Sequence, residues 1–134
     1  LACYLACLGY AVAQPPVPAD GQHLADWLAA RHLRSGLATY WQASGTTLAS
    51  GGRIQVSPVC ATKHGFTAEQ WESNASWYDP RVREASFLIL GQQAACNYPS
   101  AGQVRSAFGP PAGLYHVGPY TVLVWRRNLL TMLR

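Results

Sequence analysis

The sequence is poor in charged residues, and the charges that it has are scattered. Only 12% of the 134 residues are charged, which is about half the usual share of a soluble domain. Lys63 is the single lysine, and the arginines are spread singly along the chain apart from Arg126-Arg127. Domains that bind nucleic acid gather Lys and Arg on one face. The scattered basic residues therefore predict no nucleic-acid partner, and a formal net charge of +4 is more natural beside an anionic lipid surface.

The sequence also lacks the motifs that usually carry catalysis or metal binding. It contains no Cys-x-x-Cys and no His-x-x-x-His spacing, and no glycine-rich phosphate loop. Ser50-Gly51-Gly52 lacks the Gly-x-Ser-x-Gly frame of a nucleophile elbow. Glu69 and Glu72 could share one face of a helix, but a solvated face explains that spacing better than a general acid and base. We therefore expect no catalytic residues, no metal and no cofactor in this chain.

A full-length apolar run is missing as well, although the chain begins with a short one. Residues 1–13 carry no charge, but a bilayer-spanning helix needs roughly 20 such residues. One interpretation is the outer end of a transmembrane helix, with Tyr4 and Tyr10 in the interfacial belt. The other is a signal-peptide core with Ala11-Val12-Ala13 as the cleavage site. A proline-rich linker follows at 14–19 and a folded domain at 20–134, and both interpretations predict that this domain is extracytoplasmic.

The four cysteines fall into two groups. Cys3 and Cys7 lie in the apolar run, where they are best explained as small apolar fillers. Cys60 and Cys96 lie in the folded part, each just after a predicted strand. They could form a disulfide bond in an oxidising compartment, and the alternative is two buried thiols.

Periodicity and turn residues predict a mixed α/β fold. An amphipathic helix is expected at 21–34, with Gly36 as its stop. One or two helical turns are expected at 42–50, a short helix near Trp71 opened by a Thr67–Gln70 capping box, and a capped helix from Ser100 to Phe108. Strands are expected at 37–41, 53–59, 86–90, 114–117 and 120–125, the last two as a hairpin. This alternation predicts an α/β (α+β) fold with a small mixed sheet of about five strands and three or four helices. The unbroken apolar run 87–90 should be the central strand, covered on both faces.

Several sequence segments resemble those of one protein family. They are Leu24-Ala25-Asp26-Trp27-Leu28, Gly36-Leu37-Ala38-Thr39-Tyr40-Trp41, Ser50-Gly51-Gly52-Arg53-Ile54-Gln55-Val56, Phe108-Gly109-Pro110-Pro111 and Val122-Leu123-Val124-Trp125 with Asn128-Leu129. Together they resemble the C-terminal extracytoplasmic domain of bacterial polytopic glycosyltransferase-like membrane proteins. That class, similar to the dolichyl-phosphate-mannose transferases, uses polyprenyl-phosphate sugars.

The resemblance implies a location rather than a mechanism. It implies a domain at the cell membrane, on the extracytoplasmic side, whose partners are the membrane and the transmembrane region of the same polypeptide. Polyprenyl-phosphate sugar or a glycan acceptor would be the ligand. Enzymes of this class use an acidic residue in their first external loop as the base, and none of the six acidic residues here matches it.

One group of residues is a candidate for sugar or acceptor contact. Tyr40 and Trp41 are an aromatic pair at the end of a predicted strand, and the hydroxyls of Thr46 and Thr47 follow. Such a group could stack on a sugar and hydrogen-bond it. The alternative is that Tyr40 or Trp41 is a core residue and that the threonines cap a short helix. A second aromatic cluster, Trp71, Trp77 and Tyr78, could dock on lipid headgroups.

The predicted function is that of an accessory domain, not catalytic by itself, in a membrane glycosyltransferase-like protein. The alternative is a small secreted binding or structural module released after a signal peptide. The two hypotheses differ in what precedes residue 1, whereas they share the fold and the compartment.

Overall fold

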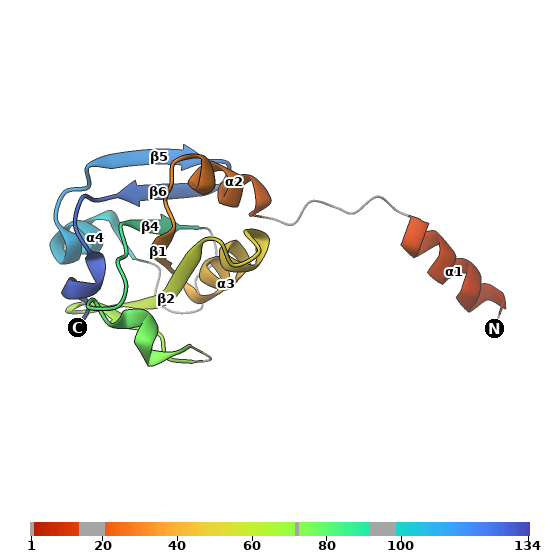
Figure 1. Cartoon of the computed structure of the whole chain (residues 1–134), viewed down its shortest axis with the longest axis horizontal. Coiled ribbons are helices and arrows are strands. Elements are labelled where there is room, and N and C mark those ends of the chain that lie inside the picture. The colour runs from red at the N-terminus through yellow and green to blue at the C-terminus, as the bar shows by residue number, and fades with distance from the viewer. Residues whose placement is uncertain (1, 14–20, 72, 92–98) are drawn as a thin grey trace.

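The folded unit is built on one mixed β-sheet. The computed structural model describes residues 2–13, 21–71, 73–91 and 99–134 (Figure 1). Within these residues six strands form the sheet in the order β3-β2-β1-β4-β6-β5. The strands are β1 (Ser35–Ala38), β2 (Gln55–Thr62), β3 (Gly65–Ala68), β4 (Phe87–Leu90), β5 (Gly113–Val117) and β6 (Tyr120–Val124). The α+β class is therefore confirmed, with six strands rather than about five.

Helices cover both faces of this sheet, as expected. They are α2 (Gln22–Ala30), α3 (Tyr40–Ala49) and α4 (Ala101–Phe108), with the short 3-10 helices η1 (Ala75–Tyr78) and η2 (Leu129–Met132). Figure 1 shows α2 and α3 next to each other and α4 close to the C-terminus. The helix α4 begins with the predicted capping box, because Ser100 accepts from the Gln103 backbone and the Gln103 side chain accepts from Ser100 N.

The middle of the sheet is parallel and its edges are antiparallel. Strand β1 pairs in parallel with β2 on one side and with β4 on the other. Strands β3 and β6 then run antiparallel to β2 and β4, and β5 and β6 form the predicted hairpin. The carboxyl ends of β2, β1 and β4 consequently point the same way.

Two hydrophobic clusters fill the space on either side of the sheet. One lies between the sheet and α4 with η2, and it includes Leu88, Phe108 and Trp125. The other lies between the sheet and α2 with α3, and it includes Leu28 and Phe87. Successive residues of β4 thus enter opposite clusters, which is why an unbroken apolar run suits a strand that is buried on both faces.

Three local predictions were wrong. Thr67 does not cap a helix: it pairs with Cys60 in the β2–β3 hairpin, where the edge of β2 satisfies backbone hydrogen-bonding groups of Gly65–Ala68. The predicted strand 37–41 ends at Ala38, and α3 begins at Tyr40. The first helix ends at Ala30, and His32, two residues further on, takes a left-handed φ of 57°. Gly36 is therefore a residue of strand β1 rather than the helix stop.

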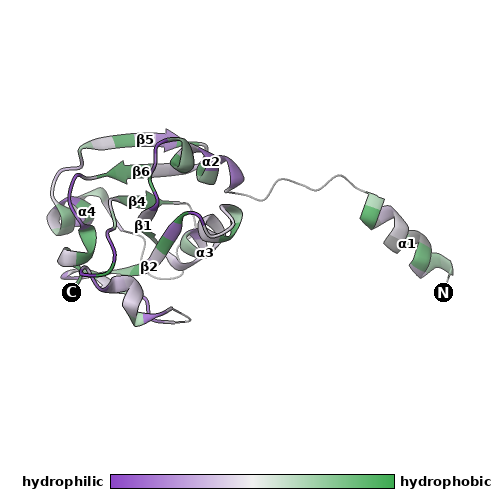
Figure 2. Cartoon of the chain, in the orientation of Figure 1, coloured by the Kyte–Doolittle hydropathy of each residue, from purple (hydrophilic) through white to green (hydrophobic). Residues whose placement is uncertain are grey.

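The apolar N-terminal run forms the helix α1 (Ala2–Ala13). Tyr4, Leu5, Tyr10 and Val12 on it are exposed, and Figure 2 shows no strongly hydrophilic residue along it. Of the helices that the structure describes, none has both the length and the apolar character needed to cross a bilayer. The predicted linker at 14–19 lies outside the described residues.

Candidate functional site

The candidate site lies at the carboxyl ends of the parallel strands. After β1 the chain passes through α3 to β2 on one side, whereas the strand on the other side of β1 is β4. The successive parallel strands are therefore added on opposite sides of β1, which makes this end of β1 a topological switch point. In open sheets with parallel strands, ligands bind outside the carboxyl ends at such a point.

Three aromatic side chains meet next to the end of β1. Tyr40, the first residue of α3, lies with its ring centroid 5.1 Å from that of Trp41, edge-on at 81°. Its centroid is also 5.2 Å from that of Trp71, with 36° between the planes. Trp41 is 59% exposed and Trp71 is 63% exposed, whereas Tyr40 is half-buried beneath them. We call these three residues the aromatic platform.

The β2–β3 hairpin and the loop after it bring Trp71 to this position. Ala68 pairs with Val59 at the end of β3, and the Glu69 N–H then donates to the Pro58 carbonyl at 3.0 Å. Pro58 is the register partner of Ala38, the last residue of β1. Trp71, two residues beyond Glu69, therefore reaches Tyr40, although the two residues are 31 positions apart in sequence.

Tyr78 fixes the loop that carries Trp71. Its hydroxyl lies 2.6 Å from the Pro58 carbonyl oxygen, 2.9 Å from that of Glu69 and 3.3 Å from Ser73 Oγ. Burial raises the pKa of this phenol, and the nearby Glu69 charge acts in the same direction against the opposing hydrogen bond to Ser73. The neutral phenol is thus the form that holds the loop, and Tyr78 is a positioning residue for the platform.

Neutral polar groups flank Tyr40 and Trp41 in the chain. Thr39 occupies the N-cap of α3, and its hydroxyl donates to Gln42 Oε1. The Gln42 amide in turn packs on Gly91, immediately after β4, where a Cβ would lie only 2.8 Å from Gln42 Nε2. The carboxyl ends of β1 and β4 are therefore joined by one threonine–glutamine pair, and no charged side chain takes part in that pair.

The structure separates the four residues that were predicted to contact a sugar. Tyr40 and Trp41 form the platform together, but Thr46 is only 3% exposed. The Thr47 hydroxyl accepts a hydrogen bond from Val56 N at 3.1 Å, which ties α3 to β2. Both threonines serve the packing of α3, so the structure does not bring their hydroxyls to the exposed rings.

The second predicted aromatic cluster is also divided. Trp71 belongs to the platform, Tyr78 is turned toward the backbone of β2, and Trp77 lies beneath the Arg83 guanidinium at 5.9 Å. The sequence carried no direct signal for the pairing of Tyr40 with Trp71. Recognising Gly65–Ala68 as a strand would have revealed it, because the hairpin folds Trp71 back onto β1.

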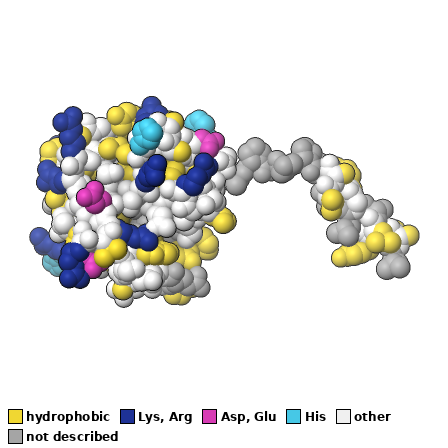
Figure 3. Space-filling view, in the orientation of Figure 1, with side chains coloured by type: hydrophobic (Ala, Val, Ile, Leu, Met, Phe, Trp, Pro, Cys, Tyr) yellow, Lys and Arg dark blue, Asp and Glu magenta, His cyan; other side chains and the backbone are white. Residues whose placement is uncertain are grey.

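Other candidate chemistry is limited in the described part of the chain. It contains no group of three or more His, Cys, Asp or Glu side chains that could hold a metal ion. Cys60 is disulfide-bonded, and its expected partner, Cys96, lies outside the described residues. Lys and Arg side chains form several separate groups on the face shown in Figure 3 rather than one continuous stripe.

Comparison with known proteins adds no relative. No family model, no curated protein and no solved structure matches the chain. The resemblance to membrane glycosyltransferase-like proteins therefore stays a prediction.

The platform is suited to binding a ring-shaped neutral molecule. Exposed indole rings offer a flat apolar surface, and their N–H groups add hydrogen-bond donors at the edge. A pyranose ring has an apolar face of C–H groups and a polar rim of hydroxyls, so it can stack on indole while its hydroxyls stay hydrated or hydrogen-bonded. A group of this kind binds and orients a ligand, and it supplies no nucleophile or general base.

Proposed function

We propose that the chain is an accessory extracytoplasmic domain, not catalytic by itself, that holds a glycan acceptor for a membrane glycosyltransferase-like protein. The aromatic platform carries this proposal. Trp41 and Trp71 are more than half exposed although the fold has two well-filled hydrophobic clusters for its other large side chains. Exposed aromatic groups of this kind are typical of binding surfaces.

Two features support a carbohydrate rather than an ionic ligand. The platform adjoins the Thr39–Gln42 pair along the chain, and both members of that pair are neutral. It is also braced from below, because Tyr40 touches both indoles and Tyr78 anchors the loop that carries Trp71. Rings that are held in place before binding lose little conformational entropy when a ligand stacks on them.

The disulfide bond at Cys60 supports the extracytoplasmic location. Disulfides persist in oxidising compartments and are rare in the cytosol. The apolar helix α1 supports a position beside the membrane, since its exposed side chains include Leu5 and Val12 together with two tyrosines suited to the lipid interface. A secreted module would share the first feature and would lose α1 on cleavage.

The binding experiment uses the 134-residue chain in a nonionic detergent. Oligosaccharides are screened by NMR, and the indole N–H signals of Trp41 and Trp71 are assigned by substitution. We expect at least one oligosaccharide to shift both signals, and Trp41→Ala or Trp71→Ala to weaken binding roughly tenfold, the scale of a lost aromatic contact of about 1–1.5 kcal/mol. Trp77→Ala is the matched control, because Trp77 lies outside the platform.

Two results would overturn the proposal. The first is that no oligosaccharide binds to the platform, whereas Trp41→Ala and Trp71→Ala abolish binding to lipid vesicles. The platform would then be a membrane-docking surface. The second is transfer of sugar from a polyprenyl-phosphate donor by the chain alone. N-terminal sequencing of the cellular protein distinguishes a membrane-bound domain from a secreted module, because a mature chain that begins near Gln14 would be a secreted module.

A further inference from the structure

A concave site lies at the end of the sheet near the C-terminus. It is a cavity of about 480 Å³, within the range of about 300–1,000 Å³ that is usual for small-molecule sites. Three separate parts of the fold line it: the turn between β2 and β3, the outer side of α4, and η2 with the residues that follow it. None of the residues that line it belongs to the aromatic platform.

The charged side chains of the lining are of one sign. Lys63, His64 and Arg134 contribute basic side chains, and none of the other lining residues is Asp or Glu. Within the described part of the chain, none of these three side chains makes an ion pair or a hydrogen bond. Cations without a carboxylate partner keep their full attraction for an anion, and a concave surface concentrates that attraction.

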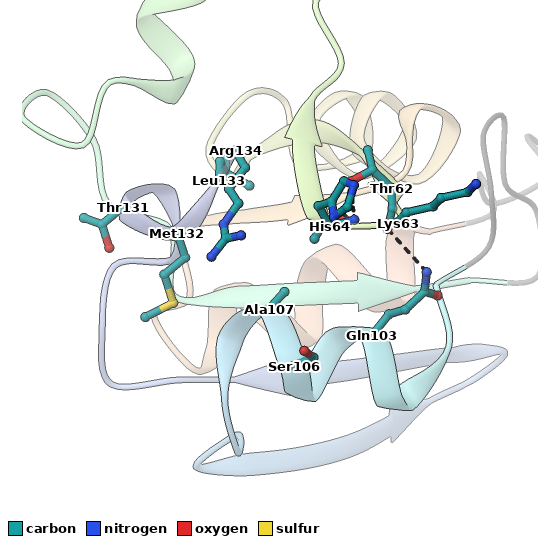
Figure 4. Close-up of a pocket in the computed structure, with 11 residues that line it drawn as sticks. Thr62, Lys63, His64, Gln103, Ser106, Ala107, Thr131, Met132, Leu133 and Arg134 are labelled. Carbon is teal, nitrogen blue, oxygen red and sulfur yellow. Dashed lines mark hydrogen bonds between the residues drawn. The ribbon is translucent and has the colours of Figure 1, made fainter.

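The side chains occupy different parts of the cavity. In Figure 4 the Arg134 guanidinium is directed toward α4, between Met132 and His64, while Lys63 extends outward at the rim. The exposed Ser106 hydroxyl faces the same space from α4. Gln103 closes one end, where its amide donates to the Thr62 carbonyl at 3.5 Å. A planar guanidinium, a mobile ammonium and a hydroxyl are the donors that phosphate oxygens accept from most effectively.

From this geometry we propose that the cavity binds a phosphate monoester or diphosphate group carried on a small polar body. The cations at the rim and centre recognise the phosphate oxygens, and the rest of the space accommodates what the phosphate is attached to. Bare inorganic phosphate would fill only part of a cavity of this size. The ligand can be a free phosphorylated metabolite or the headgroup of a lipid, since both present the same chemistry.

The test uses the 134-residue chain in a nonionic detergent with inorganic phosphate, pyrophosphate, glucose 1-phosphate and glucose as probes. Binding is measured by calorimetry and by NMR. We expect the phosphorylated probes to bind and glucose not to bind at this site, with weaker binding as the salt concentration rises. Arg134→Gln and Lys63→Gln should each weaken binding roughly tenfold or more, as expected for the loss of a charge-assisted hydrogen bond.

Arg105→Gln is the matched control, because Arg105 is an exposed cation on α4 that does not line the cavity. The control should bind as tightly as the unaltered chain, and circular dichroism should show that all three variants keep the fold. Vesicles of phosphatidylcholine with and without phosphatidic acid distinguish the source: binding to vesicles only indicates a lipid headgroup, and binding to glucose 1-phosphate only indicates a free metabolite. Failure of every phosphorylated probe to bind, or equal losses in Arg105→Gln and Arg134→Gln, would overturn the proposal.

Discussion

The ring of Phe87 occupies the place where a side chain on Gly36 would lie. The two residues are register partners in the parallel pair β1–β4, and a Cβ built on Gly36 would be 2.3 Å from the nearest ring carbon. Phe87 is fully buried at the centre of the sheet, in the cluster beneath α2 and α3. The glycine is therefore needed for the space that it leaves rather than for its backbone freedom.

Gly36→Ala should strongly destabilise the fold. The methyl group would force the Phe87 ring out of a filled cluster, and overpacking of a core costs about 1–3 kcal/mol or more. Urea unfolding followed by circular dichroism measures the loss. Gly45→Ala is the control: Gly45 lies inside α3 with nothing within 4 Å of a new Cβ, so it should gain up to about 1 kcal/mol from helix propensity. Equal stability of the two variants would contradict the β1–β4 packing described above.

Trp125→Ala should be among the most destabilising single substitutions. Trp125 is 3% exposed, lies edge-on to Phe108 at 5.8 Å and donates from Nε1 to the Gly109 carbonyl at 3.2 Å. Removing such a side chain costs about 3–5 kcal/mol. Leu88→Ala, in the same cluster, should cost about 2–5 kcal/mol. Thermal unfolding checks both, and a melting temperature that hardly changes in either variant would contradict the sheet assignment.

Tyr78→Phe should loosen the loop that carries Trp71. It removes the hydroxyl that reaches the Pro58 and Glu69 carbonyls, at a cost of about 1–3 kcal/mol if those acceptors stay buried. The variant should also bind oligosaccharides more weakly, although Tyr78 touches no ligand in the proposed binding mode. Broadening of the Trp71 indole signal in NMR would report the loosened loop, and a sharp, unshifted signal would show that Tyr78 has no positioning role.

The same residue predicts a loss of stability at alkaline pH. The folded-state pKa of Tyr78 is raised above 10.0, so the unfolded chain loses this proton first as the pH rises. The contribution of neutral Tyr78 is complete below pH 10 and falls as the pH passes from there through the folded-state pKa. Urea unfolding of the unaltered chain and of Tyr78→Phe measures it, because the difference between the two should shrink above about pH 10. A constant difference would contradict the burial of the phenol.

Much of the fold was predictable because local signals and packing agree. The run Phe87–Leu90 is apolar on both faces and is a central strand, and the Ser100–Gln103 pair opens α4 as a capping box. The hairpin of β5 and β6 follows from the Gly118-Pro119 turn between two strand-forming segments. In these segments propensity, turn residues and burial all favour the same structure.

The errors arose where tertiary contacts override local preference. The Thr67–Gln70 spacing is that of a capping box, but Gly65–Ala68 pairs with the edge of β2 as a strand. Gly36 has the character of a helix stop, but the ring of Phe87 requires it in a strand. For the same reason only half of the candidate site was predictable: Tyr40 and Trp41 are adjacent in sequence, whereas Trp71 reaches them only through the unpredicted hairpin.

Cys60 should be linked to Cys96 in the native protein. Cys3 and Cys7 are free and exposed on α1, while Cys60 is disulfide-bonded. Digestion of the protein under acidic, non-reducing conditions, after alkylation of free thiols, should yield one linked pair of peptides that contains Cys60 and Cys96. Cys3 and Cys7 should carry the alkyl label, and a label on Cys60 would contradict the prediction.

The bond between these two cysteines should also contribute to stability. It would close a loop of several tens of residues, for which the chain-entropy model gives about 3–4 kcal/mol. Cys60→Ser with Cys96→Ser should therefore lower the free energy of unfolding by about that amount, whereas Cys3→Ser with Cys7→Ser should leave it unchanged because neither thiol is bonded. A folded protein equally stable with and without a reducing agent would remove the main support for an oxidising compartment. The aromatic platform and the basic cavity would then have to be tested against cytosolic ligands.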